Sequence, residues 1–142
     1  MSKIKVLFLC SSNSARSQMA EAFLRNYAGD RFEAYSAGLE PKEIHPLTYR
    51  VMSEAGLDIS GHHITALKDL MGRVHFGYLI TVCSEAEKNC PSTFPGMGHR
   101  LFWDIEDPAA FLGTEEEKLQ KFREVRDIIR ERVTGWADTL PG

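Results

Sequence analysis

Apolar and polar residues along this chain follow two periods in turn, one typical of strands and one typical of helices. Residues 4–9 are almost continuously apolar, which predicts a short strand buried in a parallel sheet. From Arg16 the apolar positions follow a helical spacing that stops near Gly29, so we expect an amphipathic helix there. The expected core-facing stripe of that helix consists of Met19, Ala20, Phe23, Leu24 and Tyr27.

The two periods keep alternating downstream. The further expected elements are strands over residues 32–37, 76–82 and 101–103 and helices over residues 46–55 and 66–71. Gly38 stops the second strand, and Gly56 is the expected C-cap of the helix over residues 46–55. Strands that alternate with helices predict an α/β fold, a doubly wound parallel sheet of about four strands with flanking helices. We expect residues 1–142 to form a single domain.

The last helix has the clearest start signal in the chain. Thr114 and Glu117 form the S/T-x-x-E pattern of a capping box. Acidic and basic residues occupy the expected solvent face of the helix behind them. The residues expected to face the core are Leu119, Phe122, Val125, Ile128, Ile129 and Val133.

Composition excludes several classes of function. Hydrophobic residues make up 43% of the 142 and charged residues 26%, as in soluble globular proteins, and the net charge of -3 gives no basic surface for nucleic acid. No apolar stretch is long enough to cross a membrane, and the N-terminal residues lead into a strand rather than a signal peptide. Three cysteines do not make a disulfide framework. We therefore expect a cytoplasmic protein that binds neither nucleic acid nor a membrane. A monomer is also expected, although composition does not determine the oligomeric state.

The residues between the first strand and the first helix carry the strongest chemical signal. They form a C-x5-R loop that consists of Cys10, Ser11, Ser12, Asn13, Ser14, Ala15 and Arg16. Backbone N–H groups of such a loop, at the start of a helix, can converge on a tetrahedral oxyanion. The same field favours the thiolate of Cys10, which is the nucleophilic form. The guanidinium of Arg16 can grip two oxyanion oxygens at once.

Two polar residues, one after the loop and one within it, have further expected roles. Ser17 can donate a hydrogen bond to the Cys10 thiolate, cap the helix, or do both. Asn13 is expected to take a left-handed backbone angle, which asparagine tolerates better than most residues. A purely structural Cys10 is the alternative, but a strand before the loop and a helix after it favour chemistry of an oxyanion at sulfur.

Two further cysteines form a second pattern. Cys83 follows the predicted strand over residues 76–82, at the sheet edge expected for Cys10, so it can reach the Cys10 sulfur. If the six residues before Cys90 are helical, the two Cα atoms lie about 10 Å apart, whereas a disulfide needs about 7 Å or less. A disulfide between Cys83 and Cys90 then requires that segment to unwind, with the glycines and prolines of residues 91–98 supplying slack. The alternatives are two buried unreactive thiols or a zinc site, although C-x6-C is not a usual ligand spacing.

Taken together, these motifs resemble the low-molecular-weight tyrosine phosphatases and, within that superfamily, the thioredoxin-coupled arsenate reductases. The resemblance covers essentially the whole chain. The residues that carry it are Val6-Leu7-Phe8-Leu9-Cys10, Arg16-Ser17-Gln18-Met19-Ala20-Glu21, Ser36-Ala37-Gly38, Cys83, Cys90 and Asp107-Pro108-Ala109.

The resemblance implies a role for the Asp-Pro pair. In this superfamily the aspartate of Asp-Pro is the general acid, so Asp107 is the expected proton donor to a leaving oxygen. An ordinary turn is the alternative for this dipeptide. Phosphotyrosine phosphatases usually carry an aromatic residue after the proline, where this chain has Ala109, so a small inorganic oxyanion fits better. Asp104 and Glu106 are interpreted as solvated loop charges.

The function implied by the resemblance is reduction of arsenate to arsenite. Cys10 attacks arsenic, Cys83 then attacks the Cys10 sulfur, and Cys90 takes over to leave a Cys83–Cys90 disulfide. Thioredoxin is the implied electron donor, and it comes from the resemblance alone. One alternative is a phosphatase acting on phosphotyrosine or small phosphomonoesters, and weak activity of that kind is expected in any case. A second alternative is an anion- or redox-sensing protein without catalysis.

The resemblance also raises the question of a bound ion. In some members of the superfamily, Asn13, Glu21, Ser36 and a downstream aspartate bind potassium behind the loop, and here that fourth position falls on Thr65. The resemblance therefore does not predict potassium, and we expect no bound metal or cofactor. The histidines at positions 62, 63, 75 and 99 show no ligand or base pattern and are interpreted as surface or hydrogen-bonded residues.

Overall fold

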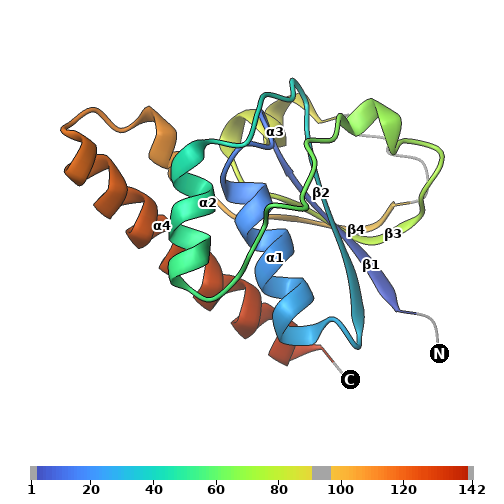
Figure 1. Cartoon of the computed structure of the whole chain (residues 1–142). Coiled ribbons are helices and arrows are strands. Elements are labelled where there is room, and N and C mark those ends of the chain that lie inside the picture. The colour runs from blue at the N-terminus through green and yellow to red at the C-terminus, as the bar shows by residue number, and fades with distance from the viewer. Residues whose placement is uncertain (1–2, 91–96, 141–142) are drawn as a thin grey trace.

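Four parallel strands lie in the order β2-β1-β3-β4 in the part of the chain that this computed structural model describes, residues 3–90 and 97–140 (Figure 1). The strands are β1 (Ile4–Cys10), β2 (Phe32–Gly38), β3 (Phe76–Thr81) and β4 (Met97–Phe102). The helices are α1 (Arg16–Ala28), α2 (Pro46–Glu54), α3 (Ser84–Asn89) and α4 (Glu115–Thr139), with short 3-10 helices at Leu67–Asp69 and Pro108–Ala110. The predicted doubly wound parallel α/β sheet with flanking helices is confirmed.

The parallel register brings the carboxyl ends of three strands to one edge of the sheet. Cys10 at the end of β1 pairs with Gly38 of β2, and Leu9 pairs with Thr81 of β3. Cys83 follows β3 by two residues and therefore leaves the sheet at the same edge as Cys10, as predicted. Ligands of open α/β sheets bind beyond this edge, where neighbouring connections diverge.

Helices α1, α2 and α4 form one group of neighbours (Figure 1). Helix α1 packs on β1 and β2 and against α4, and α2 packs on α4. Arg123 of α4 holds Glu54 at the end of α2 with hydrogen bonds of 2.9 and 2.7 Å. The predicted capping box of Thr114 and Glu117 is present, so α4 begins where the sequence places it.

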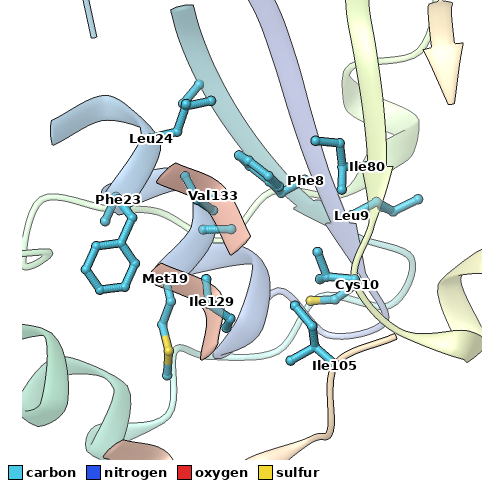
Figure 2. Close-up of a cluster of buried hydrophobic side chains, with 14 of the residues drawn as sticks. Phe8, Leu9, Cys10, Met19, Phe23, Leu24, Ile80, Ile105, Ile129 and Val133 are labelled. Atoms are coloured by element: carbon cyan, nitrogen blue, oxygen red, sulfur yellow. The ribbon is translucent and has the colours of Figure 1, made fainter. Parts of the chain in front are cut away.

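The core lies between the sheet and these helices, and Figure 2 shows part of it. Phe8 and Leu9 of β1, Met19 of α1 and Ile129 of α4 are fully buried in one apolar cluster. Cys10 belongs to the same cluster and is 1% exposed. Because close-packed interiors resist displacement, the cluster fixes the position from which the loop starts.

Two residues of the predicted apolar stripes lie outside the core. Tyr27 is 47% exposed, and its hydroxyl donates to the carboxylate of Asp138 on α4. Ile128 is 53% exposed, although its neighbour Ile129 is buried. Successive helical residues point about 100° apart, so only one of two adjacent isoleucines can face the sheet squarely. On α1 the buried position in the last turn is Ala28 rather than Tyr27.

Several element boundaries differ from prediction, most of them by a single residue. Strand β4 begins at Met97 and ends at Phe102, whereas the sequence indicated residues 101–103. Among the described residues it pairs with β3 alone, so its polar residues His99 and Arg100 remain compatible with a strand. The helix expected over residues 66–71 is a three-residue 3-10 turn. Helix α2 ends at Glu54 with Ala55 as its C-cap, so the predicted cap Gly56 lies one residue further on, with a φ of 83°.

Candidate active site

The loop between β1 and α1 is held from outside through its carbonyl groups. Those at positions 11, 12 and 14 accept hydrogen bonds of 2.8, 2.9 and 3.0 Å from backbone N–H groups of residues 40–45. The C=O and N–H of one trans peptide point in opposite directions, so the following N–H groups turn inward. The N–H of Asn13 does so and donates to the Cys10 Sγ over 3.0 Å. Asn13 has a φ of 58°, which confirms the predicted left-handed angle.

The Cys10 sulfur has a second partner. The Ser17 hydroxyl lies 2.9 Å from Sγ, which confirms the predicted contact. Ser17 does not cap α1, because the N-cap is Ala15 and no side chain bonds the helix start. Of the two predicted roles for Ser17, only the one toward sulfur is present.

Burial and the hydrogen-bond donors have opposite effects on the pKa of the Cys10 thiol. Burial raises the pKa of the Cys10 thiol, while the Ser17 hydroxyl, the charge of Arg16 and the Asn13 N–H lower it, and the balance is upward. The donors and the charge of the loop do favour the thiolate, as predicted, but burial, which the sequence did not reveal, outweighs them. Removal of the sulfur from water destabilises the thiolate more than the hydrogen-bond donors and the Arg16 charge stabilise it. The Cys10 proton needs an acceptor before the sulfur can attack.

Arg16 links the loop to the segment after β4. The side chain is 8% exposed, and Nη1 donates to the Ile105 carbonyl over 3.0 Å. Nη2 lies 3.6 Å from the Oδ2 of Asp107. The other oxygen of Asp107, Oδ1, accepts from the Ala109 N–H over 3.0 Å at the start of the 3-10 turn Pro108–Ala110. Asp107 therefore lies beside the Arg16 guanidinium, and it also starts the turn that the sequence offered as its alternative role.

A hollow of about 290 Å³ joins the loop to the second cysteine. Ser11 and Arg16 line it from the loop, Asp107 from the segment after β4, and Cys83 from the end of β3. Cys83 also starts α3, since its Sγ accepts from the Ala86 N–H over 3.4 Å. Three of the predicted site residues thus share one small cavity with the edge of the oxyanion loop.

Cys90 stands apart from that hollow, at the far end of α3. The segment between the two cysteines is helical, so their Cα atoms are about 10 Å apart along the helix axis. All three thiols are free and buried. Burial raises the pKa of the Cys90 thiol, an effect that the charge of Arg100 opposes. The slack predicted for residues 91–98 falls largely on residues 91–96, which lie outside the described part of the chain.

A second hollow of about 520 Å³ opens on the other side of Asp107. Residues that line it include Ser12, Lys42, His45 and Ala109. Ala109 offers a methyl group where an aromatic ring would be needed to stack on a phenyl ester.

The residues behind the loop do not fit a potassium ion. The Oδ1 of Asn13 accepts from the Gln18 side chain at 3.1 Å and the Thr65 N–H at 3.0 Å, which uses both of its lone pairs. Glu21 accepts from the Ser36 hydroxyl at 2.6 Å and pairs with Arg25 at 2.7 Å. Elsewhere in residues 3–90 and 97–140, no three His, Cys, Asp or Glu side chains gather as a metal ion would require.

Sequence reasoning missed the residues that brace Asn13 from behind. The Gln18 amide donates to Asn13 and to the His63 carbonyl, and its oxygen lies 2.8 Å from the His62 Nδ1. Burial lowers the pKa of His62. His62 is hydrogen-bonded, as the sequence interpretation allowed, but its partner lies 44 residues away. No local spacing signals such a contact.

The comparison with protein families agrees with this geometry. A family model described as low molecular weight phosphotyrosine protein phosphatase matches residues 5–141. The chain belongs to this family. Within the low molecular weight phosphatase family, a protein of Shouchella clausii named arsenate reductase is 41% identical over 140 residues, which are 98% of this chain and 99% of that protein.

Solved structures of similar proteins agree with the family assignment. An arsenate reductase in the phosphate binding state matches with a TM-score of 0.77 and 30% identity, covering 97% of this chain and 99% of that one. A thioredoxin-dependent arsenate reductase of Corynebacterium glutamicum matches with a TM-score of 0.67 and 35% identity. This chain is covered to 97% in that match and the neighbour to 64%. No helix in the described residues is long and apolar enough to cross a membrane.

Proposed function

We propose that this protein reduces arsenate to arsenite by a relay of Cys10, Cys83 and Cys90. The observation that carries the proposal is the hollow that Cys83 shares with Ser11, Arg16 and Asp107. A phosphatase needs only the oxyanion loop and an acid, whereas this cavity adds a second thiol. The curated relatives that match nearly the whole chain, among them the one from Shouchella clausii, support arsenate as the substrate.

The first step joins sulfur to arsenic. Arsenate enters as a dianion, and one of its oxygens takes the Cys10 proton that burial retains. The thiolate attacks arsenic, an As–O bond breaks, and Asp107 protonates the departing oxygen so that water leaves. The inward N–H groups of the loop and the Arg16 guanidinium hold the remaining oxygens. Arsenic is still As(V) in this Cys10 adduct.

The second step reduces arsenic. The Cys83 thiol gives its proton to an oxygen on arsenic and its sulfur attacks the Cys10 sulfur, so that an S–S bond forms and the S–As bond breaks. The electron pair of the S–As bond stays on arsenic, which leaves as arsenite, As(III). The Cys90 sulfur then attacks Cys83, the departing Cys10 sulfur takes the Cys90 proton, and a Cys83–Cys90 disulfide remains. Two thiols have been oxidised and arsenic has gained two electrons.

The enzyme must then be reduced by an external dithiol. We propose thioredoxin for this role, because a structural neighbour over nearly the whole chain is a thioredoxin-dependent arsenate reductase. Two electrons from its dithiol return Cys83 and Cys90 to the thiol form.

A phosphomonoester phosphatase is the second candidate, and membership of the phosphatase family favours it. The same loop, Cys10 and Asp107 suffice for that reaction. Ala109 favours substrates other than phosphotyrosine, because it provides no ring for stacking.

One pair of assays separates the candidates. The first follows NADPH oxidation by thioredoxin reductase and thioredoxin after addition of arsenate, and the second follows hydrolysis of a phosphomonoester. We expect the native protein to be active in the first and weakly active in the second.

The matched variant Cys90→Ser should keep the hydrolysis, stop after one arsenate turnover and accumulate a Cys10–Cys83 disulfide on peptide mass mapping. Steady arsenate reduction by Cys90→Ser would remove Cys90 from the relay. A native protein that hydrolyses phosphomonoesters and ignores arsenate would be a phosphatase.

A further inference from the structure

A continuous series of side chains runs from the surface of α1 to the Cys10 sulfur. It begins at Arg25, whose guanidinium Nη1 lies 3.3 Å from the His62 Nε2. The His62 Nδ1 lies 2.8 Å from the Gln18 Oε1, and the Gln18 amide reaches Asn13 at 3.1 Å. The Asn13 amide donates to the Ser17 hydroxyl over 2.7 Å, and that hydroxyl lies 2.9 Å from Cys10 Sγ.

The direction of every hydrogen bond in this series is determined by chemistry. A guanidinium carries donors only, so the His62 Nε2 must accept and its Nδ1 must carry the proton. The Gln18 Oε1 therefore accepts, which agrees with its Nε2 donating to the carbonyls of Asn13 and His63. The hydroxyl of Ser17 accepts from Asn13, so its own hydrogen is free to point at sulfur. All five donors point toward Cys10.

Arg25 is fixed at the head of the series by two other acceptors. Nη2 pairs with the buried carboxylate of Glu21 at 2.7 Å and donates to the Ala34 carbonyl at 3.1 Å. Glu21 in turn accepts from Ser36 of β2. The Arg25 guanidinium thus pairs with Glu21, the carboxylate that potassium would need as a ligand. It supplies a permanent positive charge beside that carboxylate.

We propose that Arg25 is a positioning residue of the active site, which fixes the His62 tautomer and orients the series through Gln18, Asn13 and Ser17 so that Ser17 donates to Cys10. Hydrogen bonds aligned in one direction polarise one another, so a cation at the donor end strengthens the bond at the sulfur end. The inference rests on the role proposed for Cys10 as nucleophile. It adds a residue nine positions after the loop that touches neither Cys10 nor the oxyanion.

The test is the rate at which iodoacetamide alkylates Cys10, measured at pH 7 by peptide mass mapping under reducing conditions. This measurement needs no arsenate or thioredoxin, so its outcome is independent of whether the protein is a reductase or a phosphatase. Cys83 and Cys90 in the same digest serve as internal references. We expect Arg25→Met to slow the alkylation of Cys10 by about threefold or more, the effect of half a pKa unit on its thiolate fraction. The rates at Cys83 and Cys90 should not change.

Arg50→Met is the matched control. Arg50 pairs with Glu54 at i,i+4 on α2 and its side chain is 61% exposed, while Arg25 pairs with Glu21 at i,i+4 and is 54% exposed. A general loss of one helical ion pair would affect both variants alike, whereas the proposal predicts an effect on Cys10 from Arg25→Met alone. Arg25→Lys keeps the charge but has one nitrogen where the guanidinium uses two, so it should be slowed as well, to a smaller extent. It also keeps the test open if Arg25→Met does not fold.

A double variant separates the series from a direct effect of charge. If Arg25 acts through His62, Arg25→Met and His62→Ala should each slow Cys10, and together they should slow it no more than one does. The ring 15N shifts of His62 should report the Nδ1–H tautomer in the native protein and a different tautomer balance in Arg25→Met. Unchanged alkylation of Cys10 in both Arg25 variants, or losses that multiply in the double variant, would overturn the proposal.

Discussion

At Cys10, burial and hydrogen bonding act on one sulfur in opposite directions. Burial raises the pKa of the thiol, and Ser17, Arg16 and Asn13 lower it. Because the thiolate is the reactive form, burial lowers the reactivity of this sulfur and the three donors raise it. A dianionic substrate brings its own proton acceptor, so the sulfur becomes a nucleophile when there is something to attack.

Replacing this sulfur by oxygen tests the nucleophile. Cys10→Ser should lower both arsenate reduction and phosphomonoester hydrolysis by more than about a thousandfold, because an alcohol in the same buried loop stays protonated. Phosphate binding, measured by calorimetry, should persist because the loop N–H groups and Arg16 remain. Measurable turnover by the variant in either assay would assign the nucleophile to another residue.

Gly38 tests the support beneath the loop. A Cβ at this position would lie 2.9 Å from the Asn13 nitrogen and 2.9 Å from the Ser12 carbonyl carbon. Gly38→Ala should therefore displace the peptide between Ser12 and Asn13, cost about 1–3 kcal/mol of stability and weaken phosphate binding at least about tenfold. Thermal denaturation and calorimetry measure the two effects. Gly61→Ala is the control, since nothing lies within 4 Å of its Cβ, and equal effects in both variants would contradict the prediction.

At the scale of elements, α3 separates the two cysteines that the relay must join. Cys83 caps its start, and Cys90 follows its last residue. Glu87 ties the helix to the sheet, because its carboxylate accepts from the Thr81 hydroxyl and its carbonyl accepts from Arg100 at 2.9 Å. A Cys83–Cys90 disulfide has to break this helix and these bonds, since a length of about 10 Å exceeds what a disulfide spans.

Hydrogen exchange measures that rearrangement. The singly oxidised protein should lose amide protection over residues 84–89 relative to the reduced protein, while β1 and β3 keep theirs. Mass spectrometry of the exchanged peptides makes the comparison. Equal protection of α3 in the two forms would mean that the disulfide forms without unwinding the helix.

At the scale of the whole molecule, the parallel register and the packing of α4 hold the site together. The sheet brings Cys10, Gly38 and Cys83 to one edge, although they are far apart in sequence. Helix α4 packs against α1 and α2. The hydrogen bonds from Arg123 to Glu54 are among the contacts that fix its position. These hydrogen bonds join charged groups, so the stability of the fold depends on pH.

Glu54 should contribute to the loss of fold stability at low pH. Hydrogen bonds and charges from Arg123 and Arg126 lower the pKa of Glu54 from 4.5 to about 2. A lowered folded-state pKa means that its contribution is complete above about pH 4.5 and is lost as the pH falls toward 2. Glu54→Gln should therefore flatten the fall in melting temperature between pH 4.5 and 2, and Arg123→Gln should flatten it similarly. An unchanged slope in both variants would contradict this assignment.

Local sequence was enough to predict most of the elements and the chemical types in the site. The C-x5-R loop, the left-handed Asn13, the Ser17 contact with Cys10 and the capping box of α4 are local features, because each depends on residues within a few positions of one another. The paired ends of β1 and β3 also followed from the pattern, since buried parallel strands present their carboxyl ends at one edge.

Features that depend on distant residues could not be predicted from the local pattern. The series from Arg25 to Cys10 joins α1 to residues 62–65, and no spacing in the sequence encodes that contact. The upward balance at the Cys10 thiol follows from burial by the surrounding core, which local donors cannot reveal. The exposure of Tyr27 and Ile128 and the extent of β4 likewise depend on which neighbour each face meets. Local pattern specifies what a residue can do, and packing against remote segments decides which partner it has.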